Sequence, residues 1–345
     1  MLPEPRANPL LLGHPAAEAS LLEGLAGGRL HHAWLITGPE GIGKATLAYR
    51  FARRLLAGRP APGEVDGEGL ALDPAHPVFR RVAAGAHADL ITVERGYDEK
   101  RKRARTVITV EDVRRVAAFM ALTPAEGGWR VAVVDGAEEM NQAAANALLK
   151  VLEEPPARAV LLLVSAAPGR LLPTLRSRCR RLRLSSLSDP VMAEVLAHAL
   201  PDMAETERGR LATLAEGSPG RALLLAEAEG LAIATLVDDV LDALPALPPQ
   251  RAHEVADRLG RAEDGFSTFM DLLRAALAAA VRETLQGQAD PRQERLVALR
   301  PLAAWGDVWQ GLTRLQDETE RFALDKRQAI VAGLALLANP AQGPA

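Results

Sequence analysis

The chain has 345 residues, of which 48% are hydrophobic, 25% are charged and only 3% are aromatic. A net charge of -3 argues against a cationic nucleic-acid coat, and the single cysteine excludes an internal disulfide and a four-cysteine zinc site. The longest apolar runs fall short of the ~20 residues that span a bilayer, and the N-terminus lacks a signal-peptide pattern, so we expect a cytoplasmic protein of two or three domains.

Strands and helices are predicted to alternate in the first half of the chain. A strand at 33–37 runs into a glycine-rich loop and a helix that ends near Gly58, and a helix at 110–122 has Thr109 as its N-cap. Further strands are predicted at 89–94, 130–135, 159–165 and 181–184, with a helix at 141–154 that two prolines terminate. Near-continuous apolar strands that alternate with helices indicate a parallel sheet covered on both faces.

Two segments of this half show no clear period. Residues 58–88 are rich in Pro, Gly and Ala, and they are expected to form an insertion loop. Residues 96–105, GYDEKRKRAR, are expected to form a charged turn, for which a solvated loop is favoured over a phosphate contact.

After about residue 186 the strand signal disappears and helices are predicted throughout. The longest, EDGFSTFMDLLRAALAAAVRETL, carries an apolar stripe at helical spacing, formed by Phe266, Phe269, Leu272, Leu273, Leu277 and Val281. The proline-broken segment 243–250 marks a candidate domain boundary, and the tail at 339–345 is expected to fray.

Residues 38–47 read GPEGIGKATL, which matches the G-x-x-x-x-G-K spacing of a phosphate-binding loop. Gly38, Gly41 and Gly43 allow the backbone to curl so that its N–H groups face a phosphate, and Lys44 would reach the β and γ phosphates. A strand before the loop and a helix after it are the context that the motif requires. We therefore favour this interpretation over a tight turn with a surface lysine.

The loop departs from a hydrolytic site in its metal ligands. Ala45 stands where a hydroxyl normally holds Mg²⁺, and Thr46 is turned from that position by about 100° around the helix. Asp135, at the end of a predicted strand, fits the second metal-holding acid, although it could instead cap a helix. The next residue is Gly136, where a hydrolytic site would carry a glutamate.

Three further motifs follow the loop in order: DGAEEM, AANALLKVLEEPP and LRSRC. Together they resemble the delta-prime family of bacterial DNA polymerase III clamp-loader subunits, which are AAA+ proteins. The resemblance is dense from residue 12 to residue 184, and GSPGRAL at 217–223 extends it. It implies an α/β P-loop AAA+ module, a parallel sheet with flanking helices, followed by a small helical lid and an all-α collar.

The resemblance implies roles for two site residues. Arg178, in the S-R-C motif, would act as an arginine finger that reaches the ATP of a neighbouring ATPase subunit. Without the resemblance, Arg178 would be interpreted as one of several surface arginines in salt bridges. Ser165 matches the family's sensor-one position, although a strand-end hydroxyl could simply cap a turn. Where active relatives place a lid arginine, this chain has Gly220, with Arg221 one step on.

The resemblance also bears on cofactors. The family often carries a four-cysteine zinc module between the loop helix and the next strand, but residues 58–88 contain no cysteine. His76 and His87 alone cannot make a structural zinc site, so we expect neither zinc nor another metal centre. ATP with Mg²⁺ is the only expected ligand, at a degenerate site formed by Gly38, Gly41, Gly43, Lys44, Thr46, Asp135 and Ser165.

The implied domains are an AAA+ module at 1–185, a helical lid at 186–245 and a collar at 246–345. The implied partners are the gamma/tau ATPase subunits and the delta subunit in a ring of five, with the sliding clamp and primed DNA reached through the assembly. The implied role is a stator of the DNA polymerase III holoenzyme with weak or absent ATPase activity. The alternative is a self-sufficient AAA+ ATPase in which Lys44 and Asp135 are competent and Thr46 holds Mg²⁺, and nucleotide binding without turnover lies between the two.

Overall fold

The computed structural model describes residues 3–27, 30–58, 69–98, 103–105, 107–260 and 264–338. The chain divides into two compact units, Met1–Arg221 and Ala222–Ala345. The predicted domain boundaries after residues 185 and 245 stay predictions.

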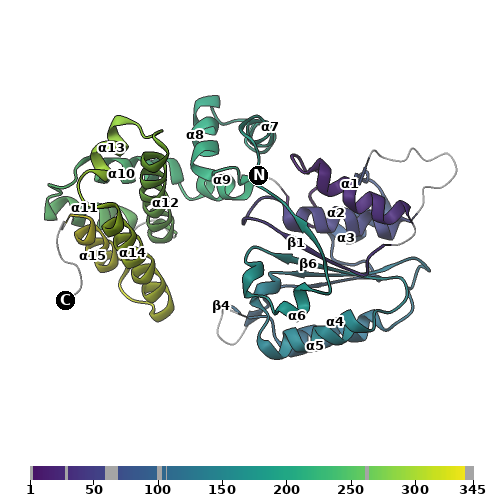
Figure 1. Ribbon diagram of the computed structural model, residues 1–345. Helices are drawn as coiled ribbons and strands as arrows, with labels where there is room; N and C mark the ends of the chain where they lie inside the picture. The colour runs from purple at the N-terminus through teal and green to yellow at the C-terminus, as the bar shows by residue number, and fades with distance from the viewer. Residues whose placement is uncertain are drawn as a thin grey trace. The chain divides into compact units, whose positions relative to one another are not determined.

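The first unit is built on a five-stranded sheet in the order β2-β5-β6-β1-β7 (Figure 1). All of its strand pairings are parallel. The strands are β1 (Ala33–Thr37), β2 (Leu90–Val93), β5 (Arg130–Asp135), β6 (Ala159–Ser165) and β7 (Arg180–Arg183). Every residue of β1 and β6 is buried, as expected for central strands with helices on both faces. The parallel sheet predicted from the sequence is confirmed.

Two helical layers cover this sheet (Figure 1). The two layers are α1 (Pro15–Ala26), α2 (Lys44–Ala57) and α3 (Pro77–Ala83) on one face, and α4 (Val110–Met120), α5 (Gln142–Glu153) and α6 (Pro173–Arg176) on the other. A hydrophobic core lies on each face of the sheet, and successive residues of β1 belong to opposite cores. Trp34 and Ile36 pack in the layer of α2, whereas Ala33 and Leu35 pack in the layer of α5.

The predicted ends of the helices agree with the structure. Helix α2 ends at Ala57 with Gly58 as its C-cap, and α4 begins after Thr109, whose backbone N–H donates to the Asp112 carboxylate at 3.0 Å. Helix α5 begins after Asn141, whose side chain accepts from the backbone N–H of Ala144, and it ends at Glu153 before the two prolines.

The insertion predicted as a loop at 58–88 contains a helix. Residues 59–68 lie outside the described residues, but α3 follows them and buries Val78, Phe79 and Val82. The expectation of a loop was wrong at α3, because a helix of this length is too short to show a period. In the charged segment 96–105, β3 (Tyr97–Asp98) pairs antiparallel with β4 (Arg103–Ala104), and residues 99–102 lie outside the description.

The rest of the chain is helical, as predicted. Helices α7 (Asp189–Ala199) and α8 (Glu205–Ala215) belong to the first unit, and α9 (Pro219–Glu227) spans the boundary between the units. The second unit contains α10 (Gly230–Asp242), α11 (Pro249–Leu259), α12 (Gly265–Gln286), α13 (Pro291–Val297), α14 (Leu302–Phe322) and α15 (Lys326–Ala338). Among the described residues, no helix has the length and apolar character needed to cross a bilayer.

Two short 3₁₀ turns complete the first unit, η1 (Ala137–Glu139) after β5 and η2 (Pro168–Arg170) after β6. The apolar stripe predicted on the longest helix packs inward along α12, where Phe266, Phe269 and Leu273 are each at most 2% exposed. The tail at 339–345 lies outside the described residues.

Candidate functional site

The carboxyl ends of three adjacent strands bring most of the predicted site residues together. In the sheet register, Thr37 at the end of β1 lies opposite Ser165 at the end of β6, and Asp135 at the end of β5 lies opposite Val164. The glycine loop leaves β1 at this same edge. The glycine loop, Asp135 and Ser165 therefore form one site, which is where parallel sheets of this kind bind ligands.

The glycine loop has the backbone conformation that its sequence predicts. Gly38, Gly41 and Gly43 have φ angles of 148°, 75° and 98°, which side chains other than glycine adopt rarely. A Cβ atom on Gly38 would lie 2.4 Å from the Leu184 carbonyl oxygen, so this position also needs glycine for space. The start of α2 directly after Gly43 places a helix N-terminus at the loop, which favours an anion.

Lys44 is buried at the start of α2, with 7% of its surface exposed. Its Nζ donates to the Pro39 carbonyl oxygen at 2.6 Å. Burial lowers the pKa of Lys44, while the nearby negative charges of Glu138, Asp135 and Glu40 act in the opposite direction. The ammonium group thus lies among acidic side chains at the edge where a phosphate would sit. Thr46 is also buried, within the first turn of α2.

Asp135 lies at the end of β5 and does not cap a helix. Gly136 is the N-cap of η1, and Asn141 is the N-cap of α5. Burial raises the pKa of Asp135, and the charge of Glu94 adds to this increase, whereas the Gly136 N–H and Lys44 oppose it. A carboxyl group with a raised pKa next to a buried lysine is typical of a functional site.

Gly136 has a left-handed backbone with φ of 71° and ψ of 45°. A Cβ atom there would lie 2.8 Å from Glu139 Oε2, the carboxylate that pairs with Arg95 Nε at 2.7 Å. The position where a hydrolytic site would carry a glutamate is therefore one where the backbone favours glycine.

Glu138 belongs to the site, although its sequence position, on the turn after Gly136, does not make it an obvious substitute for the missing glutamate. Its Oε1 accepts from the backbone N–H groups of Ala166 and Ala167 at 2.7 and 3.1 Å, directly after Ser165. Within the described part of the chain, Glu138 Oε2 and Ser165 Oγ are both buried without a hydrogen-bond partner. The sequence shows only that Glu138 follows Asp135 by three residues, and the 3₁₀ turn η1 is what brings it back to the sheet edge.

The GSPGR segment packs directly on the glycine loop. Ser218 Oγ donates to the Glu40 carbonyl oxygen at 2.7 Å, and the Gly220 N–H donates to the Gly41 carbonyl oxygen at 2.9 Å. The Arg221 guanidinium instead pairs with Glu216 at 3.2 Å. The Ser218 side chain and the Gly220 backbone, rather than an arginine side chain, thus make these contacts with the loop.

Arg178 lies near the amino-terminal ends of the strands, at the end of the sheet opposite the glycine loop. It precedes β7, whose first residue, Arg180, lies opposite Trp34 near the start of β1, whereas the glycine loop follows Thr37 at the end of β1. With about 3.3 Å per residue, these two levels are about 10 Å apart along the strand, before either loop is added. The structure therefore separates Arg178 from the glycine loop of its own chain.

The Arg178 side chain is 37% exposed. One terminal nitrogen lies 2.8 Å from Glu153 Oε1, and the other donates to the Thr174 carbonyl oxygen at 2.9 Å. The next residue, Cys179, is buried, and burial raises the pKa of its thiol to about 12. The cysteine of the S-R-C motif is therefore a packing residue rather than a nucleophile.

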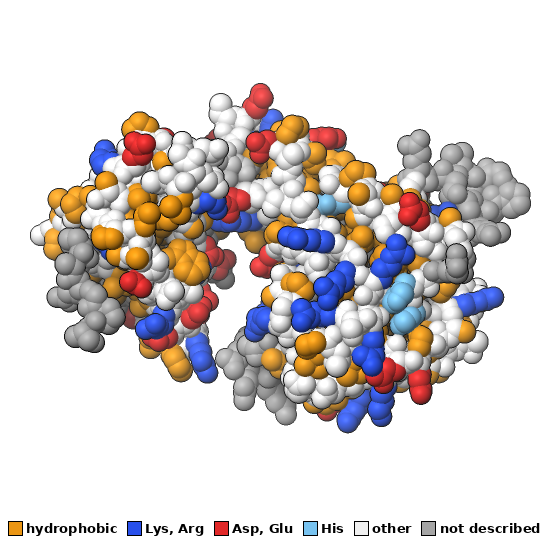
Figure 2. All heavy atoms as spheres, viewed as in Figure 1, with side chains coloured by type: hydrophobic (Ala, Val, Ile, Leu, Met, Phe, Trp, Pro, Cys, Tyr) orange, Lys and Arg blue, Asp and Glu red, His pale blue; other side chains and the backbone are white. Residues whose placement is uncertain are grey.

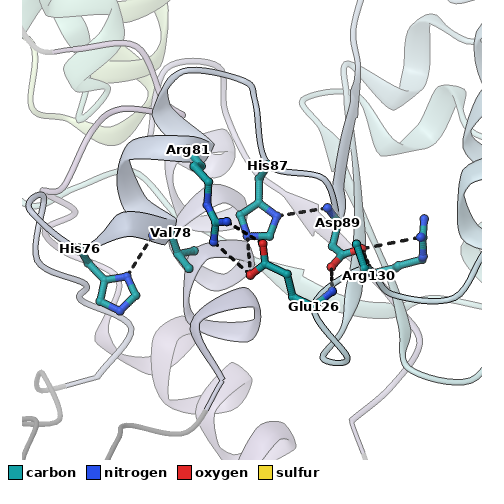
Figure 3. Close-up of polar contacts among 8 residues, drawn as sticks. His76, Val78, Arg81, His87, Asp89, Glu126 and Arg130 are labelled. Carbon is teal, nitrogen blue, oxygen red and sulfur yellow. Dashed lines mark hydrogen bonds and ion pairs between the residues drawn. The ribbon is translucent and has the colours of Figure 1, made fainter.

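His76 and His87 make separate contacts with the backbone (Figure 3). His76 Nδ1 accepts from the Val78 N–H at 3.1 Å and caps α3, and His87 Nδ1 accepts from the Asp89 N–H at 3.2 Å. Beside His87, Arg81 pairs with both oxygens of Glu126 at 2.6 and 3.0 Å. The expectation that the chain carries no zinc stays a prediction.

The fold and the site together define an α/β P-loop module of the AAA+ class, with a glycine loop after β1, an acid at the end of β5 and a polar residue at the end of β6. Residues 13–188 match the family model described as DNA polymerase III, delta subunit, and the chain belongs to this family.

Individual relatives share this similarity over part of their length. The chain is 43% identical over 178 residues to the DNA polymerase III subunit delta' of Pseudomonas aeruginosa, covering 51% of this chain and 50% of that protein. It is 31% identical over 192 residues to the DNA polymerase III subunit tau of Salmonella typhimurium, covering 55% of this chain and 27% of that protein. The match thus spans about half the length of the first relative and less of the second.

Among solved structures, a DNA polymerase III gamma subunit-related protein of Thermotoga maritima aligns with 93% of this chain and 98% of its own. Its sequence identity is 17% and the TM-score is 0.45.

Proposed function

We propose that this chain is a delta-prime-type stator of a DNA polymerase III clamp loader, which presents Arg178 to the ATP bound by a neighbouring ATPase subunit. The observation that carries the proposal is the position of Arg178, at the sheet edge opposite its own glycine loop and partly exposed. From there the guanidinium is available to another subunit and not to its own loop. A planar, permanently charged group with forked donors is suited to the charge that develops on a transferring phosphoryl group.

The glycine loop of the chain itself fits a phosphate better than it fits hydrolysis. Loop N–H groups, a helix N-terminus and Lys44 supply donors for an anion. The residues do not fit Mg²⁺-dependent cleavage, since Ala45 has no hydroxyl and Gly136 has no carboxylate. We therefore propose a degenerate nucleotide site with little or no turnover.

The proposed partners follow from the family and the relatives. The chain is similar both to a subunit named delta' and to one named tau, which favours an assembly of related subunits. We propose the gamma/tau and delta subunits as neighbours in a ring of five in the bacterial cytoplasm, with the sliding clamp and primed DNA as substrates of the assembly. On the face shown in Figure 2, Lys and Arg side chains gather over the first unit, which suits anionic partners.

The test is the DNA-stimulated ATPase activity of a loader reconstituted with Arg178→Ala. We expect turnover to fall by at least about tenfold, because arginine fingers contribute about 10³ to 10⁵ in GTPases. The matched control is Arg181→Ala, which removes the same charge from an exposed position of β7. Unchanged turnover in the Arg178 variant would remove the proposed finger.

The alternative, a self-sufficient ATPase, is favoured by the buried Lys44 beside Asp135. It predicts phosphate release by the purified chain alone with ATP and primed DNA, and loss of this release in Lys44→Ala. We expect the purified chain to release phosphate no faster than the Lys44→Ala variant does. Equilibrium binding of a labelled nucleotide then distinguishes a loop that binds from one that does not.

A further inference from the structure

Two anchors hold the Arg178 guanidinium, and they come from different helices. Glu153 is the last residue of α5, and Thr174 lies in α6. The contacts with Glu153 Oε1 at 2.8 Å and with the Thr174 carbonyl at 2.9 Å involve the two terminal nitrogens separately. Since a guanidinium has five N–H donors, these contacts leave three for a phosphate. The two contacts therefore order the Arg178 side chain without occupying all of its N–H donors.

The helix end that carries Glu153 is itself fixed. His32 Nε2 lies 3.1 Å from the carbonyl oxygen of Leu152, one residue before Glu153, and the Glu154 N–H donates to the Lys150 carbonyl at 3.0 Å. His32 stacks on His31 with ring centroids 4.6 Å apart. The backbone of Arg178 is fixed as well, by its N–H bond to the Leu175 carbonyl at 3.2 Å. The carboxylate and the arginine are thus both presented from well-defined backbone positions.

We propose that Glu153 is a positioning residue for the arginine finger, an inference that rests on the proposed function. Its carboxylate holds the guanidinium of Arg178 against the Thr174 carbonyl, so that the remaining N–H groups are oriented before the triphosphate of a neighbouring subunit arrives. A free arginine would have to lose its rotamer freedom when it met the phosphate, whereas this one has already lost part of it. Glu153 acts only through Arg178 and does not touch the nucleotide.

The experiment uses the reconstituted loader and measures kcat and KM for ATP separately. In Glu153→Ala we expect kcat to fall about two- to fivefold, because a half-exposed ion pair orders a side chain only weakly, and KM to stay unchanged. Glu153→Gln keeps an oxygen that can accept from the guanidinium, and it should recover part of the loss. The matched control is Glu154→Ala, an exposed glutamate one residue further on, which should behave as the unmodified chain.

A double variant separates this inference from the proposed function. In Arg178→Ala with Glu153→Ala, turnover should equal that of Arg178→Ala alone, because Glu153 then has nothing to position. If Arg178→Ala lowers turnover but Glu153→Ala does not, the positioning role of Glu153 is wrong. It is also wrong if the double variant turns over more slowly than Arg178→Ala alone. In both cases the proposed arginine finger itself is still supported. If Arg178→Ala itself has no effect, the proposed function fails first.

Discussion

Two residues of the glycine-loop site have pKa values shifted toward their neutral forms. Burial lowers the pKa of Lys44, and burial together with Glu94 raises that of Asp135. Each shift means that folding disfavours the charged form of the group. Both groups therefore lower the stability of the fold near neutral pH, as is common at sites kept for binding rather than for packing.

Asp135→Asn should stabilise the chain at pH 7. The folded pKa of Asp135 lies above its ordinary value of 3.8, so the folded state binds more protons between these two values. Stability is therefore lost as pH rises through that window, and the penalty is fully present at pH 7. We expect the melting temperature of the variant to exceed that of the unmodified chain by about 1–3 °C at pH 7, with the difference shrinking toward pH 4.

Thermal melts of both chains at several pH values would check this expectation, with the exposed Asp202→Asn as a control for the loss of one surface carboxylate. A lower melting temperature for Asp135→Asn at pH 7 would mean that the hydrogen bond from the Gly136 N–H and the charge of Lys44 outweigh the burial of the Asp135 charge.

At the scale of elements, the contact between the GSPGR segment and the glycine loop depends on two glycines. A Cβ atom on Gly220 would lie 2.7 Å from the Cα atom of Gly41, and one on Gly41 would lie 2.5 Å from Ser218 Oγ. The contact of Gly220 is with the backbone of Gly41, so it cannot be relieved by moving a side chain. The lid arginine of active relatives therefore cannot be restored at position 220 while this contact persists.

Gly220→Ala should destabilise the first unit by about 1–3 kcal/mol, the usual cost of overpacking. Gly209→Ala is the control, because Gly209 lies inside α8 with no atom near the added Cβ, and it should be neutral or stabilising by about 0.4–1 kcal/mol. Urea unfolding followed by circular dichroism measures both. Equal stability of the two variants would contradict the close contact.

Most of the sheet could be predicted from the sequence because the four strands other than β7 contain short, mostly apolar runs, whereas β7 reads RRLR. The runs at 33–37 and 159–165, for example, are fully buried strands. Helix α3 was missed because its 7 residues are too few to establish the helical spacing of Val78, Phe79 and Val82, and they follow a long Pro- and Gly-rich stretch. Local pattern thus determines elements that are long enough to show a period.

Only those residues of the site that belong to sequence motifs could be predicted. The loop, Asp135 and Ser165 lie at strand ends, whose common edge follows from a parallel sheet. Glu138 was missed because its position depends on a 3₁₀ turn that no sequence pattern marks. The pair of Glu153 and Arg178 could not be foreseen either, since it depends on how α5 packs beside α6.

At the scale of the whole molecule, the second unit has an apolar surface that the isolated chain leaves open. Helices α12 and α14 line a hollow of about 400 Å³ with Leu277, Val281, Leu285, Trp305 and Trp309. Leu285 and Trp309 are 68% and 39% exposed. Figure 2 shows hydrophobic side chains gathered over this unit. Exposed apolar patches of this kind commonly mark protein interfaces, which suits the packing against other subunits that the family resemblance implies for the collar at 246–345.

Leu285→Asp should weaken assembly with the ATPase subunits at least about tenfold while leaving the melting temperature of the isolated chain within about 2 °C, because the side chain is already exposed. Leu224→Asp is the control, since Leu224 is 66% exposed but does not line the hollow. Gel filtration or surface binding with the purified ATPase subunits measures the assembly. Normal assembly of the Leu285 variant would place the collar contact elsewhere.

The left-handed conformation of Gly136 bears on any attempt to engineer hydrolysis into this chain. A glutamate at this position would begin with a backbone strained by about 1–2 kcal/mol and would have to displace the Glu139 carboxylate before it could activate any water. The chain tolerates such strain elsewhere, since Glu216 and Glu229 have φ angles of 49° and 52°. Because Ala45 also lacks the hydroxyl that would hold Mg²⁺, the glutamate alone would not recover turnover.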